Sequence, residues 1–152
     1  MNKNFEQLLE DDLRLFLFDQ GIDYPFSTPS SVSGRADVIG KIETEDPIII
    51  EIKILDREKN YGKNRIKSGF SQIVKYANDY NKDVGYLVIY NMDEAELNLN
   101  FTKKENTFPP SIQFNGKVFY FIIINLATVE SASKVGKMRE IEITESELVK
   151  NN

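Results

Sequence analysis

The segment from Ile48 to Leu55 constrains the fold more than any other part of the chain, because a run of isoleucines there contains two charges at its centre. β-Branched residues favour strands, and a segment this apolar is typical of a central strand. Alternate residues of a strand share one face, so Glu51 and Lys53 point to the same side, opposite to the even-numbered isoleucines. Because burying unpaired charge is costly, we expect both side chains to face a partner or a cleft. The alternatives are a simple ion pair, or an edge strand whose charges face water.

The elements around this segment predict an α/β fold with a mixed sheet flanked by helices. Helices are predicted at residues 6–20 and 63–80, and a short final helix after the capping box of Thr144 and Glu147. Strands are predicted at residues 34–41, 48–55, 84–90, 97–101, 118–126 and 139–143. The 152 residues suit one domain, 1–152, with its core at about 5–90. Residues 91–152 would add strands and the short helix.

The absence of two particular residue types excludes several kinds of chemistry. The chain has no Cys and no His. It therefore has no thiol nucleophile, no zinc site of the usual kind and no imidazole general base. A metal held by carboxylates and carbonyls would be a hard cation such as Mg²⁺, Mn²⁺ or Ca²⁺. The phosphate-binding loop of nucleotide hydrolases is also absent, because no Gly stands five positions before Gly62.

A second carboxylate, Asp37, lies on the strand predicted before Ile48–Leu55. If the two strands pair as a hairpin, Asp37 lies beside Glu51 with both carboxylates on one face. Carboxylates so placed repel each other unless a cation or a proton joins them, and Mg²⁺ needs few protein ligands. Lys53 would orient or deprotonate a metal-bound water, or stabilise charge that develops on a phosphate. Metal-assisted phosphodiester hydrolysis requires these parts.

The pattern of Asp37, thirteen residues and then Glu51-Ile52-Lys53 resembles the PD-(D/E)XK nuclease superfamily. Arg35 and Asp37 belong to a Gly-Arg-x-Asp sequence that resembles one bacterial branch of this superfamily. Residues 72–76 resemble the Gln-x-x-x-Tyr motif of its exonuclease-type members. The resemblance covers residues 5–90. It implies a restriction-endonuclease-like three-layer α/β/α fold with a central mixed sheet and the core order α-β-β-β-α-β. Ala36 stands where the family name has Pro, a position that carries no chemistry.

The resemblance also implies a function, a Mg²⁺- or Mn²⁺-dependent nuclease acting most readily on DNA. Asp37 and Glu51 would bind the metal together with the main-chain carbonyl of Ile52. Lys53 would act on the attacking water. Gln72 would support the site or contact the nucleic-acid backbone, with Tyr76 one turn further along the helix.

Members of this superfamily often place another acid on the first helix. The apolar side chains there form one broad face on a helical wheel: Phe5, Leu8, Leu9, Leu13, Phe16 and Leu17. Glu6 lies at the margin of this face and is favoured by analogy, whereas Asp12 lies nearer its centre and is the alternative. Glu10 and Asp11 are expected to point towards solvent. For either residue, the alternative to a role in the site is an acid at the start of the helix that only complements the helix macrodipole.

Basic residues gather between Lys53 and Lys67, although the whole chain has a net charge of −5. This segment carries +4, which leaves −9 on the rest of the chain. Tyr61 and Gly62 interrupt it, as suits a loop with a stacking residue. A basic segment beside a metal site is where a phosphate backbone would lie, and the alternative is a solvated loop and helix start. The predicted nucleic-acid contacts are Arg35, Arg57, Lys59, Lys63, Arg65, Lys67 and Tyr76.

Two other interpretations stay open. One is a binding module on the same fold that holds nucleic acid or protein without cutting, and the other is an unrelated α/β domain whose ion pair imitates the motif. The acidic N-terminal stretch lacks the apolar region of a signal peptide, and the longest apolar run, 118–126, is about half of the ~20 residues that span a membrane. We therefore expect a cytoplasmic protein with no membrane partner. A homodimer or larger assembly is expected by analogy with other small nucleases.

Overall fold

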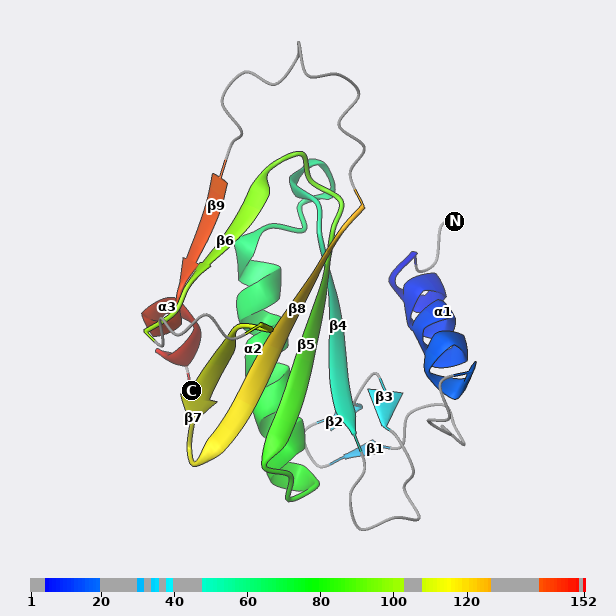
Figure 1. Cartoon of the computed structure of the whole chain (residues 1–152), viewed down its shortest axis with the longest axis vertical. Coiled ribbons are helices and arrows are strands. Elements are labelled where there is room, and N and C mark those ends of the chain that lie inside the picture. Colours follow the sequence, from blue (N-terminus) through cyan, green and yellow to red (C-terminus); the bar gives the residue numbers. More distant parts are fainter. Residues whose placement is uncertain are drawn as a thin grey trace.

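The computed structural model describes residues 5–19, 30–31, 34–35, 38–39, 48–102, 108–126, 140–150 and 152. Within them the chain forms an α/β fold around a mixed sheet with the strand order β3-β4-β5-β8-β7 (Figure 1). The pairs β4–β5 and β5–β8 are parallel, whereas β3–β4 and β7–β8 are antiparallel. The predicted α/β class is therefore confirmed.

Most elements follow the predicted segments, but the strand predicted at residues 34–41 contains two short strands with different partners, at residues 34–35 and 38–39. The central sheet consists of β3 (Val38–Ile39), β4 (Ile49–Leu55), β5 (Val84–Asn91), β7 (Ser111–Phe114) and β8 (Lys117–Asn125). Two further pairs are β1 (Ser30–Ser31) with β2 (Gly34–Arg35), and β6 (Glu96–Asn100) with β9 (Glu140–Thr144). The helices are α1 (Phe5–Asp19), the 3-10 helix η1 (Arg57–Lys59), α2 (Lys63–Asp79) and α3 (Glu145–Val149). None of the helices in the described ranges has the length and hydropathy that crossing a bilayer would need.

Two strands, β1 and β7, are missing from the sequence prediction, which places no strand before residue 34 and a single strand between residues 91 and 116. The chain turns back at Asn115 and Gly116, whose φ angles are +51° and +72°, so that β7 pairs antiparallel with β8. Two consecutive residues with positive φ make the tight turn that matches the twist of a β-hairpin. The Asn-Gly pair was the signal that could have predicted this hairpin.

The larger core lies between the sheet and α2. Phe70 and Ile73 of α2 are fully buried there and pack with Phe119 and Phe121 of β8. β6, β9 and α3 add apolar side chains to the same cluster, among them Leu97, Ile141 and Leu148. The predicted capping box is confirmed at the start of α3, where the side chain of Thr144 accepts from the backbone N–H of Glu147 at 3.3 Å.

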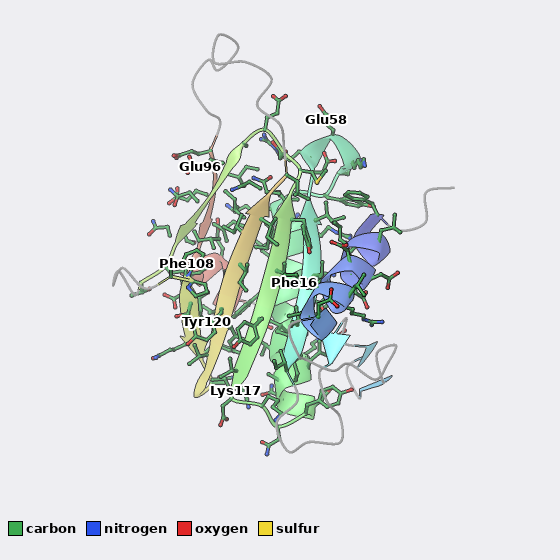
Figure 2. The ribbon with its side chains drawn as sticks, turned by 45° about the vertical axis from the view of Figure 1, so that its right-hand side comes forward. Phe16, Glu58, Glu96, Phe108, Lys117 and Tyr120 are labelled. Atoms are coloured by element: carbon green, nitrogen blue, oxygen red, sulfur yellow. The ribbon has the colours of Figure 1, made fainter. Side chains whose placement is uncertain are left out.

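The opposite face of the sheet is covered in part by α1. Leu9, Leu13 and Leu17 pack there against the even-numbered isoleucines of β4. Further along the same face, Tyr120 of β8 stacks on Tyr86 of β5 with ring centroids 5.6 Å apart (Figure 2).

The orientation of α1 corrects the sequence prediction. The broad apolar face does not point inward as a whole, because Leu8 and Phe16 are 63% and 56% exposed. Glu10, expected to face solvent, is buried and pairs with Arg14. The inward stripe has a spacing of three and four residues and consists of Glu6, Glu10, Leu13 and Leu17, with Leu9 at its side. Contact with β4 decides which side of α1 points inward. The number of apolar residues on each side of the helical wheel does not predict it.

Candidate metal and nucleic-acid site

The two charges of β4 are buried side by side. Glu51 is 1% exposed and Lys53 is 8% exposed, and Lys53 Nζ lies 2.9 Å from Glu51 Oε1. Both belong to the same face of the strand as Ile49 and Leu55, which pack in the core against α2. The shared face is therefore confirmed, and the alternative in which both charges face water is wrong.

Helix α1 brings a second carboxylate to this pair. Glu6 Oε1 lies 3.9 Å from Lys53 Nζ, and the other oxygen of Glu6 pairs with Arg65 of α2. Glu6, Glu51, Lys53 and Arg65 thus form a group with two negative and two positive charges, which we call the β4 charge cluster. Asp12, the alternative acid, is exposed. The structure therefore favours Glu6, because it lies on the inward stripe of α1.

Helix α2 lies directly over the cluster. Arg65, Gly69 and Gln72 follow one another at spacings of four and three residues, so they share one side of the helix. A Cβ atom at Gly69 would lie 2.7 Å from Cγ of Lys53, which shows how closely the helix backbone approaches the lysine stem. Gln72 Oε1 is buried and has no hydrogen-bond partner in the described part of the chain. A buried amide oxygen of this kind is an acceptor that a ligand or a water would satisfy.

Tyr61 holds Arg65 from the other side. The guanidinium lies 4.2 Å from the centroid of the Tyr61 ring, within the range of a cation–π contact. Arg65 is therefore fixed between an aromatic ring and the carboxylate of Glu6. Tyr61, predicted to be a stacking residue of a loop, therefore stacks on a residue of its own chain.

The other predicted basic contacts meet acids from distant parts of the chain. Arg57 donates to both carboxylate oxygens of Asp93, at 2.7 and 2.8 Å, and Lys63 donates to Glu147 at 2.8 Å. These hydrogen bonds hold the pKa of Asp93 well below its usual value and lower the pKa of Glu147. Counting charges along residues 53–67 missed both acids, because they lie 36 and 84 positions away from their partners.

The remaining predicted nucleic-acid contacts differ in how exposed they are. Lys59 is exposed and lies 5.9 Å from the centroid of the Phe5 ring, and Lys67 of α2 is half-buried. Tyr76 is 4% exposed and belongs to the core on the α2 side, so its position lends no support to the predicted contact with nucleic acid. Arg35 is the last residue of β2 and pairs with Ser30, and its side chain lies outside the described part.

The residues present suit a hard cation in their chemistry. Glu6 and Glu51 offer carboxylate oxygens, which Mg²⁺ and Mn²⁺ prefer. No group of three or more acidic, His or Cys side chains that could hold a metal occurs in the described ranges. Asp37, the third predicted ligand, lies outside them, although Val38 beside it in the sequence pairs with Ile50 beside Glu51. The described residues of this site therefore supply two carboxylates, those of Glu6 and Glu51.

Comparisons with known proteins find no match to this chain. No protein-family model matches the chain, and neither the curated proteins nor the solved structures include a match. The resemblance to the PD-(D/E)XK superfamily therefore rests on the motif residues of this chain alone.

Proposed function

We propose that the protein is a Mg²⁺- or Mn²⁺-dependent nuclease of the PD-(D/E)XK type, which hydrolyses phosphodiester bonds in DNA. The observation that supports this function best is the buried Glu51–Lys53 pair, with Glu6 approaching the same ammonium group. Apolar side chains of similar volume are often as stabilising as a buried ion pair, so the fold alone does not call for these charges. Buried charges that converge in this way are instead typical of functional sites.

The order of elements gives further support. α1 precedes the antiparallel pair β3–β4, α2 follows β4, and β5 pairs parallel to β4. Helices α1 and α2 pack on opposite faces of the sheet. This arrangement supports a restriction-endonuclease-like core, in which Glu51 and Lys53 would lie on the strand that carries the superfamily motif.

Each residue of the candidate site then has a chemical role. A bound divalent cation would polarise the phosphate and activate water, and Asp37, Glu51 and the carbonyl of Ile52 would hold it. Glu6 would contribute a further carboxylate from α1. Lys53 would orient the attacking water and stabilise the negative charge that develops on the phosphate oxygens.

Two residues of α2 complete these roles. Gln72 would accept a hydrogen bond at its buried Oε1, which has no partner in the described part of the chain. Arg65 would contact a phosphate of the backbone through guanidinium N–H groups other than the one that pairs with Glu6.

The test is a cleavage assay on supercoiled plasmid and on labelled single-stranded DNA, with Mg²⁺, Mn²⁺ or EDTA. Lys53→Met keeps an unbranched stem beside Gly69 but removes the ammonium group, and Lys75→Met on the exposed side of α2 is the matched control. We expect metal-dependent cutting that falls about 100-fold or more in Lys53→Met, as loss of a transition-state donor does, and that is unchanged in the control. Wild-type activity in Lys53→Met would contradict the mechanism. No cutting by the folded wild type with either metal would contradict the function.

A second candidate is a catalytically silent module on the same fold that binds nucleic acid or protein. The charge balance of the β4 charge cluster favours it, because Glu6 and Glu51 each have a cationic partner without any metal. Such a module would bind the same DNA equally well in EDTA and in Mg²⁺ and would leave it intact.

A further inference from the structure

We propose that Gly69 is a positioning residue for Lys53. The space left by its missing side chain receives the stem of Lys53 and directs the ammonium group to Glu51 and Glu6. The effect of this role on catalysis rests on the proposed function, whereas its structural part can be tested without any activity.

The contact between α2 and β4 leaves no room for a side chain at position 69. A Cβ atom there would lie 2.7 Å from Cγ and 3.4 Å from Cε of Lys53, and 3.1 Å from Cδ1 of Leu87. Contacts below 3.0 Å essentially do not occur for real Cβ atoms, so the lysine stem would have to move. Lys53 is 8% exposed, which means that the protein encloses the stem on its other sides.

The backbone conformation does not call for glycine at this position. Gly69 lies inside α2, and the positive φ angle that favours glycine is found at Gly116 instead. Glycine also weakens a helix interior relative to alanine. The close approach of Lys53 is therefore the physical reason for a glycine here.

The position of the stem decides where the ammonium group lies. Lysine has four rotatable methylene groups, yet Nζ of Lys53 is held 2.9 Å from Glu51 and 3.9 Å from Glu6. A methyl group at position 69 would displace Cγ and, with it, the ammonium group. A displacement of about 1 Å in a reacting group can reduce a rate by about 100-fold.

The structural part is tested by a double-mutant cycle on thermal unfolding. In the Lys53→Ala background the stem is gone and only Cδ1 of Leu87 stays close, at 3.1 Å, so Gly69→Ala should raise Tm by up to about 2–4 °C through helix propensity. In the wild-type background the same change should lower Tm or leave it level.

Gly85→Ala is the matched control, because its Cβ would meet Ile73 at 2.9 Å and Phe119 at 3.0 Å but not Lys53. It should lower Tm equally in both backgrounds. Equal effects of Gly69→Ala in both backgrounds would overturn the proposed contact.

The positioning role is tested by kinetics and by NMR. Gly69→Ala should lower kcat by about 10- to 100-fold with KM changed less than about twofold, whereas Gly85→Ala should leave kcat unchanged. In protein labelled with ¹³Cε-lysine, the Lys53 signal, identified by its loss in Lys53→Arg, should shift in Gly69→Ala and stay in place in Gly85→Ala. An unmoved Lys53 signal, or a wild-type kcat in Gly69→Ala, would overturn the role. If the wild type does not cut DNA, the proposed function fails, but the NMR shift and the unfolding cycle still decide whether Gly69 positions Lys53.

Discussion

Lys53 and Glu51 compensate each other in a place where neither charge would be stable alone. Both are almost fully buried, and 2.9 Å separates Lys53 Nζ from Glu51 Oε1. A buried pair of this kind adds little net stability, but removing one partner leaves an uncompensated charge inside the protein. In the proposed nuclease, the ammonium of Lys53 would therefore compete with a divalent cation for the carboxylate of Glu51.

Lys53→Met should make the thermal stability depend more strongly on divalent cations. The variant removes the charge that competes for Glu51, so Mn²⁺ should bind more tightly than in the wild type. A tenfold gain in affinity would add about 1.4 kcal/mol, or about 3–6 °C, to the stabilisation by Mn²⁺. Scanning calorimetry with and without Mn²⁺ measures this shift. Lys75→Met should respond as the wild type does, and an equal response from Lys53→Met would contradict the competition.

The sequence predicts some of these residues but not others. The shared face of Glu51 and Lys53 follows from the period of a strand, whatever the strand packs against. The choice of Glu6 over Asp12 does not follow from the wheel, because Leu8 is apolar and still exposed. Only contact with β4 fixes which side of α1 points inward. Nothing in a single sequence marks Gly69 as a residue that contacts Lys53.

Among the elements, α1 connects the candidate site to the other face of the sheet. It packs on β4 through Leu9, Leu13 and Leu17, and its first turn carries Glu6. The placement of Glu6 therefore depends on how firmly these leucines hold the helix against the sheet.

Leu13→Ala should loosen α1 and weaken the site, whereas Leu15→Ala on the exposed side should do neither. Leu13 is partly buried, so we expect its truncation to lower the free energy of unfolding by about 1–2 kcal/mol, less than a fully buried leucine loses. Leu15 is 62% exposed, and its change should stay within about 0.5 kcal/mol. Urea unfolding measures both values, and cleavage assays should show reduced activity in Leu13→Ala alone. Equal losses in the two variants would show that α1 does not depend on this face.

Across the whole molecule, ion pairs between distant segments compensate the basic segment. Asp93 binds Arg57, Glu147 binds Lys63 and Glu6 binds Arg65. The sequence shows the local excess of +4 but not these partners, because pairing depends on which segments the fold brings together. The basic surface available to a phosphate backbone is therefore smaller than the sequence indicates.

Asp93 should make the global stability fall in acid. Hydrogen bonds from the Arg57 side chain, the largest cause, hold the pKa of Asp93 below the usual value of about 3.9. Because the folded pKa is lower than the unfolded one, the stabilisation is complete above pH ~4–5 and is lost as pH falls through the folded pKa. Asp93→Asn should lower Tm at pH 7 by a few degrees and flatten the loss of stability between about pH 5 and pH 2. Thermal unfolding across this range is the measurement. Glu94→Gln, at an exposed neighbour, should keep the wild-type slope, and an identical slope in Asp93→Asn would refute this role.

Calorimetric titration of Mn²⁺ tests most directly whether Asp37 and Glu51 hold a divalent cation together. The proteins to compare are wild type, Asp37→Asn, Glu51→Gln and Glu58→Gln, the last at an exposed carboxylate on η1 (Figure 2). We predict that the wild type and Glu58→Gln bind Mn²⁺ with the same affinity and that Asp37→Asn and Glu51→Gln each lose about tenfold or more, because each removes a charged oxygen ligand. Unchanged Mn²⁺ binding in both folded variants, or no binding by the wild type, would contradict a metal-dependent nuclease site on β4.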